Sequence, residues 1–393
     1  MLQIKTSLTA TSFFMTAVIV FAMAGSMAAH GGQWPQGTTH WTNDGRNNQW
    51  KTPMNWEKGE TPAADEMAYI NRSGKNRAIV KENTSVGAIR VGAGNSNTGE
   101  LEIHSALNVN RRHSAVGSGG GRGRVVQQAG SVYLKWGDLL IGAGGHNSQG
   151  IWTLKGGSIN VGRGGLIVGD DTGAEGVLDI TGGTLRTRHS PHRIGPGGVF
   201  RVAGSDIKEI GIGAKGDPSG SWTQSGKLQI AIGPEGVTPI RINGGNVTFK
   251  RGARLEPSFL DQPRQGTWKI MEWEQGNAKN EGLLLADQVD EALWKFKLHE
   301  RENGGGYMTI SRRMVEGLKV DAIKTPAQTR LGEQISVEAE IVNPRSSEQT
   351  EQVKFIADDE VVDTAEMTLD SESSHPVNFN YTMPVTGNVE FRI

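Results

Sequence analysis

A short glycine-anchored unit is repeated along the middle of the chain, from about residue 89 to residue 249. Each copy has an apolar pair ending in Val-Gly or Ile-Gly, a polar turn, an alternating strand, a Gly-Gly turn and a second alternating strand. A fixed period of about 25 residues predicts a solenoid, because one unit cannot bury its apolar face without a neighbour. The period tightens to about 20 residues at the end. The anchoring glycines are Gly92, Gly117, Gly142, Gly169, Gly195, Gly213 and Gly233.

Apolar and polar residues alternate inside each unit, as in Leu101-Glu102-Ile103. This two-residue period is that of a strand with one buried face. The corners between strands need positive φ or close backbone approach, which explains 55 glycines in 393 residues. We therefore predict an all-β chain whose main part is a parallel β-helix with about three strands per coil. Seven coils at the inter-strand spacing of about 4.8 Å would rise roughly 34 Å.

The first 29 residues are typical of a secretory signal peptide. Lys5 lies near the start, an apolar stretch runs from Phe13 to Ala24, and small residues lead to Ala29. The apolar stretch is short for a membrane span, so we expect cleavage near Ala29 in preference to retention as an anchor. The mature protein is then secreted or displayed on the cell surface, with no membrane span.

Composition and charge limit the kinds of site and the partners that the chain can have. The chain has no cysteine, which excludes disulfides and thiolate catalysis. Its formal net charge is −1, but the tail from Met314 carries 15 acidic and 6 basic residues. The preceding part is therefore net basic, which suggests different partners for the two parts.

The pattern changes three more times along the mature chain. Residues 30–85 are a tryptophan-rich lead-in with the first strands, and residues 86–250 carry the repeats. Residues 251–312 lose the repeat, and we expect a C-terminal cap and linker there. Residues 313–393 hold short alternating strands between turns, which predicts an immunoglobulin-like β-sandwich. The sequence stops inside or just after the last of these strands, which leaves open whether the sandwich is truncated.

The lead-in contains Trp34, Trp41, Trp50 and Trp56. Exposed indole rings stack on sugars, which makes Trp34 and Trp41 candidate glycan-binding residues. A solenoid also needs a cap over its first coil, and large aromatic side chains bury much area with few residues. We favour the cap.

The lead-in, the Val-Gly and Gly-Gly-x-Leu units and the closing segments resemble secreted bacterial repeat proteins of the autotransporter-passenger type, which often carry a PEP-CTERM sorting signal. The closing segments are Gly266–Met271, Trp294-Lys295-Phe296 and Tyr307–Ile310. The resemblance covers roughly Trp34 to Ser311 and implies a β-helical exported or surface protein with a structural or adhesive role. The chain departs from that family by ending without an apolar sorting helix, which leaves its anchoring open.

The tail has a second resemblance. The sequences Leu331–Val337, Val342-Asn343-Pro344 and Asp358-Asp359-Glu360 are similar to the cell-adhesion-related bacterial domain often abbreviated CARDB. The resemblance covers nearly all of residues 313–393. It implies an extracellular module or spacer.

The repeats offer little for catalysis. Parallel β-helices that cleave polysaccharides need clustered carboxylates, or an Arg or Lys base, on adjacent coils. Asp170-Asp171 is the only acidic pair in the repeats, and no second pair recurs one period away, so we interpret it as a solvated turn. Arginines beside His189 and His192 would repel a cation. We predict no catalytic residue, metal or cofactor.

A basic cluster is the most suggestive feature of the repeats. Strand alternation sends Arg186 and Arg188 outward if Leu185 faces the core. Outward guanidinium groups could hold carboxylate or sulfate groups of an acidic glycan. The alternative, which we favour, is a solvated face that discourages lateral aggregation. The cluster consists of Arg186, Arg188, His189, His192 and Arg193.

These observations favour a secreted or cell-surface structural or adhesion protein without catalytic activity. Its expected partners are extracellular glycans, among them acidic ones, or other surface proteins. Nucleic acid is not expected, because no aromatic residues are interleaved with the basic cluster. The alternative is a protein that binds or degrades acidic polysaccharides through Trp34, Trp41 or the basic cluster.

Overall fold

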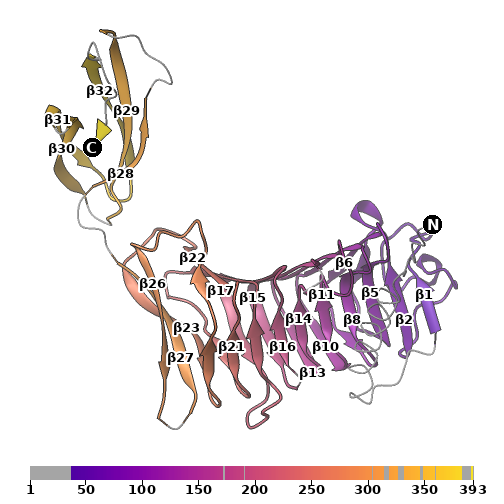
Figure 1. The fold of residues 1–393 in the computed structure, drawn as a ribbon. Coiled ribbons are helices and arrows are strands. Elements are labelled where there is room, and N and C mark those ends of the chain that lie inside the picture. Colours follow the sequence, from indigo (N-terminus) through magenta and orange to yellow (C-terminus); the bar gives the residue numbers. More distant parts are fainter. Residues whose placement is uncertain are drawn as a thin grey trace, which may run out of the picture.

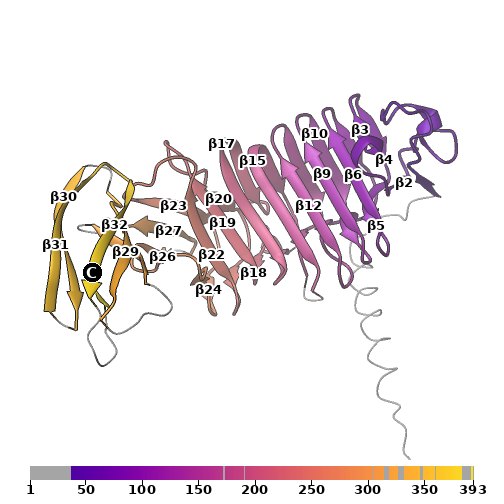
Figure 2. The same ribbon diagram turned by 90° about the horizontal axis from the view of Figure 1, so that it is seen from above.

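The computed structural model describes residues 37–170, 173–189, 191–302, 304–313, 318–325, 332–345, 348–358, 360–382 and 391–392. Regular structure in these residues is β, apart from two 3-10 turns, η1 (Pro53–Asn55) and η2 (Gly74–Asn76). A long stack of parallel strands is followed by a smaller β unit (Figures 1 and 2). The predicted all-β fold is confirmed. The predicted signal peptide and Trp34 lie outside the described residues.

One face of the stack is a ten-stranded parallel sheet, called sheet A here, with one strand from each coil. Each of its inner strands pairs with the coil before and the coil after it, as β11 does with β8 and β14. In spatial order the strands are β1 (Gly37–His40), β2 (Glu66–Ile70), β5 (Ala88–Ala93), β8 (Ser114–Ser118), β11 (Leu139–Ile141), β14 (Leu166–Val168), β16 (His192–Ile194), β18 (Trp222–Gln224), β21 (Val247–Phe249) and β24 (Ala278–Asn280).

The other two faces form a second sheet, called sheet B here, with two parallel ladders. The first ladder consists of β3 (Ala78–Val80), β6 (Thr98–Ile103), β9 (Arg122–Gln127), β12 (Gln149–Leu154), β15 (Glu175–Thr187), β17 (Gly198–Ile212), β19 (Lys227–Ile232), β22 (Arg254–Phe259) and β25 (Leu284–Leu285). The second consists of β4 (Thr84–Val86), β7 (Leu107–Val109), β10 (Ser131–Trp136), β13 (Ser158–Arg163), the far ends of β15 and β17, β20 (Ile240–Ile242) and β23 (Gly266–Trp273). The chain is thus a β-solenoid with three faces and about nine turns.

The coils do not shorten toward the end. Ile141 pairs with Val168, Val168 with Ile194 and Ile194 with Gln224, which are steps of 27, 26 and 30 residues. The predicted tightening to about 20 residues is wrong, because Gly213 and Gly233 follow strands of sheet B and not of sheet A. The ladders also begin before residue 86 and continue past residue 250.

Like residues stack on like along the interior. Val91, Val116, Ile141, Val168 and Ile194 follow one another on the inner side of sheet A, and all are fully buried. Complete burial of such a side chain stabilises the fold by up to about 1.5–3 kcal/mol. The interior is therefore a set of apolar columns that only a stacked neighbour can complete.

Gly142 shows why the corner after β11 requires glycine. Its φ is +56°, and a Cβ at this position would lie 1.7 Å from the carbonyl oxygen of Glu175 on the next coil. Gly92 and Gly117 meet the next coil in the same way, at 1.8 and 1.9 Å. The backbone of one coil turns directly against the backbone of the next.

The tryptophans of the lead-in form a cluster at the first coil. Trp50 and Trp56 pack edge to face at 4.7 Å, and Trp41 packs against Trp56 at 5.1 Å. The backbone N–H of Trp50 donates to the carbonyl of Ile79, so this segment pairs with the outer edge of β3. The cluster therefore covers the start of the solenoid, as a cap does.

The last coils are closed by antiparallel pairing. Strand β27 (Gly306–Arg312) pairs antiparallel with β23 and with β26 (Trp294–Glu300). Trp294 and Trp268 pack on Phe259 at 5.4 and 5.6 Å. The parallel ladder is thus replaced by a hairpin at this end.

The tail has its own core between two antiparallel sheets. Phe355 and Phe379 stack at 5.0 Å, with Val337 buried in the same cluster. This arrangement is compatible with the predicted immunoglobulin-like sandwich. One sheet contains β28 (Lys319–Lys324), β29 (Gln334–Val342) and β32 (Ser374–Thr382); the other contains β30 (Gln349–Ala357), β31 (Glu360–Leu369) and β33 (Phe391–Arg392).

The corner geometry predicts that Gly142→Ala lowers the free energy of unfolding of the solenoid by more than about 3 kcal/mol, because the two backbones must separate. Gly144→Ala is the control. Gly144 also has positive φ, but its Cβ would meet nothing within 4 Å. Backbone strain alone should then cost about 1–2 kcal/mol. Urea unfolding followed by tryptophan fluorescence measures both, since every tryptophan precedes residue 313. Equal losses would refute the close-packing explanation.

Candidate binding groove on sheet A

The structure divides the predicted basic cluster among different surfaces. Leu185 is fully buried, while Arg186 and Arg188 are exposed on sheet B, as the alternation predicts. Arg186 lies between Asn160 of the previous coil and Gly211 of the next in its outward row. There is consequently no continuous row of guanidinium groups at this position.

Two members of the cluster have acidic partners. The Arg186 Nη2 and Nε atoms donate to Glu209 Oε2 at 2.5 and 3.0 Å, and this hydrogen bond raises the pKa of Arg186. His189 Nδ1 lies 2.5 Å from Asp217 Oδ2. These pairs join neighbouring coils and neutralise most of the local charge. They therefore support the interpretation of this cluster as a solvated face and not as a glycan-binding site.

His192 is a correction to the sequence analysis, because its side chain is fully buried. It follows Leu139 and Leu166 in an inward column of sheet A. Its Nδ1 accepts a hydrogen bond from the N–H of Leu166 at 3.1 Å, so Nε2 carries the proton and donates to Thr187 Oγ1 at 3.1 Å. Burial lowers the pKa of His192 to about 4. This neutral histidine belongs to the core and does not reach a ligand.

Trp41 is also unable to serve as a sugar platform. Its side chain is 2% exposed, and its Nε1 donates to the carbonyl of Asn76 at 2.8 Å. Both ring faces are therefore unavailable for stacking on a glycan.

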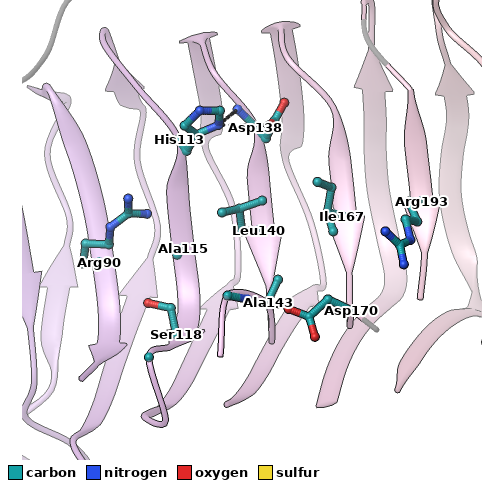
Figure 3. Close-up of a pocket in the computed structure, with 12 residues that line it drawn as sticks. Arg90, His113, Ala115, Ser118, Asp138, Leu140, Ala143, Ile167, Asp170 and Arg193 are labelled. Atoms are coloured by element: carbon teal, nitrogen blue, oxygen red, sulfur yellow. Dashed lines mark hydrogen bonds and ion pairs between the residues drawn. The ribbon is translucent and has the colours of Figure 1, made fainter. Parts of the chain in front are cut away.

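Arg193 lies away from Arg186, on the outer face of sheet A. It belongs to an outward row that pairs from coil to coil, and it is the last of five successive members that line a groove of about 500 Å³. The five members are Arg90, Ala115, Leu140, Ile167 and Arg193. Figure 3 shows the three apolar side chains in line between the two arginines. The groove thus has an apolar floor with a cation at each end.

The rims of the groove are polar, and their two carboxylates accept hydrogen bonds from backbone N–H groups of adjacent coils. Asp138 Oδ1 accepts from the N–H of Gly165 at 2.6 Å, and the Asp138 N–H donates to His113 Nδ1 at 2.9 Å. On the other rim, Asp170 Oδ2 accepts from the N–H of Gly144 at 2.7 Å. Each carboxylate therefore links two neighbouring coils through a hydrogen bond.

Arg90 is the cation of the groove that has a side-chain nitrogen without a hydrogen-bond partner in the described part of the chain. Its side chain is half-buried, and burial lowers its pKa although a hydrogen bond with Tyr69 opposes the change. A guanidinium remains charged in any case. Within the described residues, its Nη1 atom is buried and has no hydrogen-bond partner. A buried charged donor of this kind favours an anionic oxygen.

The groove continues along the rod. A second hollow of about 540 Å³ shares Ile167 and Arg193 with the first and extends past Thr223 to Lys250. Lys250 pairs with Glu281 at 3.0 Å. The two hollows together follow the axis of the stack and cross the strands of sheet A.

Sequence reasoning missed this groove, although the repeat contains its signal. The five residues of the row stand two positions before Gly92, Gly117, Gly142, Gly169 and Gly195. Because the residue two positions before the anchoring glycine is equivalent in these coils, it identifies one outward row. The apolar centre and basic ends of that row are visible once the copies are aligned by their glycines.

The described residues contain no group of three His, Cys, Asp or Glu side chains placed to hold a metal ion. No helix in the same part of the chain is long and apolar enough to cross a membrane. Comparison with protein-family models, curated proteins and solved structures finds no match in any of the three.

The buried position of His192 predicts a pH-dependent stability. Between pH 6.5 and about 4 the unfolded chain binds a proton at His192 that the folded chain does not. Stability is therefore complete above pH 6.5 and falls by about 3 kcal/mol as the pH drops to 4. His192→Asn, whose amide oxygen can replace Nδ1 as acceptor, should flatten this slope in thermal unfolding. His146→Asn, at an exposed turn, should leave it unchanged; identical slopes in all three proteins would contradict the assignment.

Proposed function

We propose that the protein is a secreted or cell-surface structural or adhesion protein without catalytic activity. In this proposal the solenoid is a stiff rod that presents one binding face, and the C-terminal unit is a spacer or contact module. The resemblances to autotransporter-passenger and PEP-CTERM-type repeat proteins and to the CARDB domain support this role. The predicted signal peptide supports export.

The observation that carries the proposal is the contrast between the faces of the rod. Basic and acidic residues on sheet B pair between neighbouring coils, so the charges there neutralise one another. Pairs of this kind contribute little stability when exposed, and their main effect is on the surface potential. They are Arg77 with Glu102, Arg124 with Glu100, Arg201 with Asp179, Lys227 with Glu256 and Arg241 with Glu272. Sheet A also has pairs between coils, such as Lys250 with Glu281, but it alone carries the apolar groove that Arg90 and Arg193 border.

The rims of the groove favour binding over cleavage. A glycosidase needs one carboxyl group to protonate the leaving oxygen and a second to attack or to activate water. Asp138 and Asp170 each accept a backbone hydrogen bond from an adjacent coil. Both carboxylates are therefore engaged in holding adjacent coils together. Degradation of acidic polysaccharides therefore remains the second candidate.

The test is binding of the purified protein without residues 1–29 to bacterial envelope fractions. We expect saturable retention on intact envelopes or on their glycan fraction, and no release of reducing ends during incubation. Heat-unfolded protein is the control for nonspecific adsorption. Absence of binding to envelopes, glycans and the protein itself would overturn the adhesive role. Release of reducing ends would show that the protein degrades polysaccharides.

A further inference from the structure

We propose that the groove of sheet A binds a linear, uronate-rich polysaccharide that lies along the rod axis. Arg90 and Arg193 bind its carboxylates, and Ala115, Leu140 and Ile167 support its sugar rings. This inference deepens the proposed function by naming the ligand class of its binding face.

The spacing of the two arginines sets the length of the ligand. Arg90 is on β5 and Arg193 on β16, with β8, β11 and β14 between them. Four inter-strand steps amount to about 19 Å. One pyranose unit of an extended glycan is about as long as one step. A segment of about four or five units therefore reaches from one guanidinium to the other.

The floor suits the apolar face of a sugar ring. Ala115 is 1% exposed, and Leu140 and Ile167 are half-buried, so the floor is low and flat at Ala115 and rises at its two larger members. The C–H faces of pyranose rings can pack on such side chains, while their hydroxyl groups point to the rims. In Figure 3 Ser118 and Asp170 lie on one rim and His113 and Asp138 on the other. These rims offer donors and acceptors along both sides of a chain.

The charge at the Arg90 end of the groove favours an anionic group. A guanidinium binds a carboxylate through two parallel hydrogen bonds, and the geometry of this pair is specific. Arg90 has a buried donor atom without a partner in the described residues. The rest of the Arg90 side chain borders the groove, where a carboxylate of the ligand can pair with the guanidinium. A neutral glycan would offer this cation no charged partner.

The topology disfavours an extended peptide as the occupant. Peptides join sheets by pairing with an exposed strand edge. Every strand from β5 to β16 already has neighbours on both sides in sheet A, so no strand edge is open to a peptide there. The occupant must therefore lie across the face of the sheet, as a sugar chain can.

The experiment measures binding of galacturonate oligomers by isothermal titration calorimetry, with neutral glucan oligomers for comparison. We expect the affinity to rise from the trimer to the hexamer, because only the longer chains contact both arginines. Binding should weaken as salt is added. Arg90→Gln and Arg193→Gln should each weaken hexamer binding about tenfold or more, since each removes a charge-assisted pair. Leu140→Glu, which places a negative charge on the floor, should abolish it.

The matched control is the double variant Arg186→Gln, Arg188→Gln on sheet B, which should bind as the wild type does. Thermal unfolding verifies that each variant is folded. Failure of the wild type to bind galacturonate oligomers would overturn the inference, as would loss of binding in the control alone. Retention on envelopes without galacturonate binding would preserve the adhesive role and reject only this ligand.

Discussion

Parallel pairing between successive coils is the constraint on which the other features depend. Each inner strand of sheet A donates to and accepts from the coils on both sides, so the backbone of the rod is one continuous ladder. The corners allow this only because glycine permits positive φ and direct backbone contact, as at Gly142 against Glu175. The apolar columns of the interior follow from the same register. At the two ends, where no further coil continues the ladder, tryptophans and a hairpin replace it.

The same register determines the surface. Since every coil places equivalent positions one above the other, each outward position becomes a row along the rod. On sheet B several basic residues pair with acidic residues of a neighbouring coil, as Arg241 does with Glu272 at 2.8 Å. On sheet A one stretch of a row has three apolar residues between Arg90 and Arg193, which produces the groove. A solenoid can thus acquire a binding face by substitutions at a single position of its repeat.

The repeat made the fold predictable, but not all of its side-chain environments. Two-residue alternation placed Leu185 inside and Arg186 outside, because both lie on one uninterrupted strand. It did not place His192, since the corner at Pro191 resets the alternation and turns this side chain inward. Glu209 and Asp217, the partners of Arg186 and His189, are a coil away and follow turns of unequal length. Coil lengths were misjudged for the same reason: turns vary freely while strands stay in register.

Hydrogen exchange with and without galacturonate hexamer tests most directly whether sheet A is the binding face. We expect the ligand to slow exchange in the corner segments that border the groove, around Gly119 and Gly144. Exchange should be unchanged in residues 186–189 and in the described strands of the tail. Slowed exchange confined to residues 186–189 or to the tail, or none at all, would contradict the account.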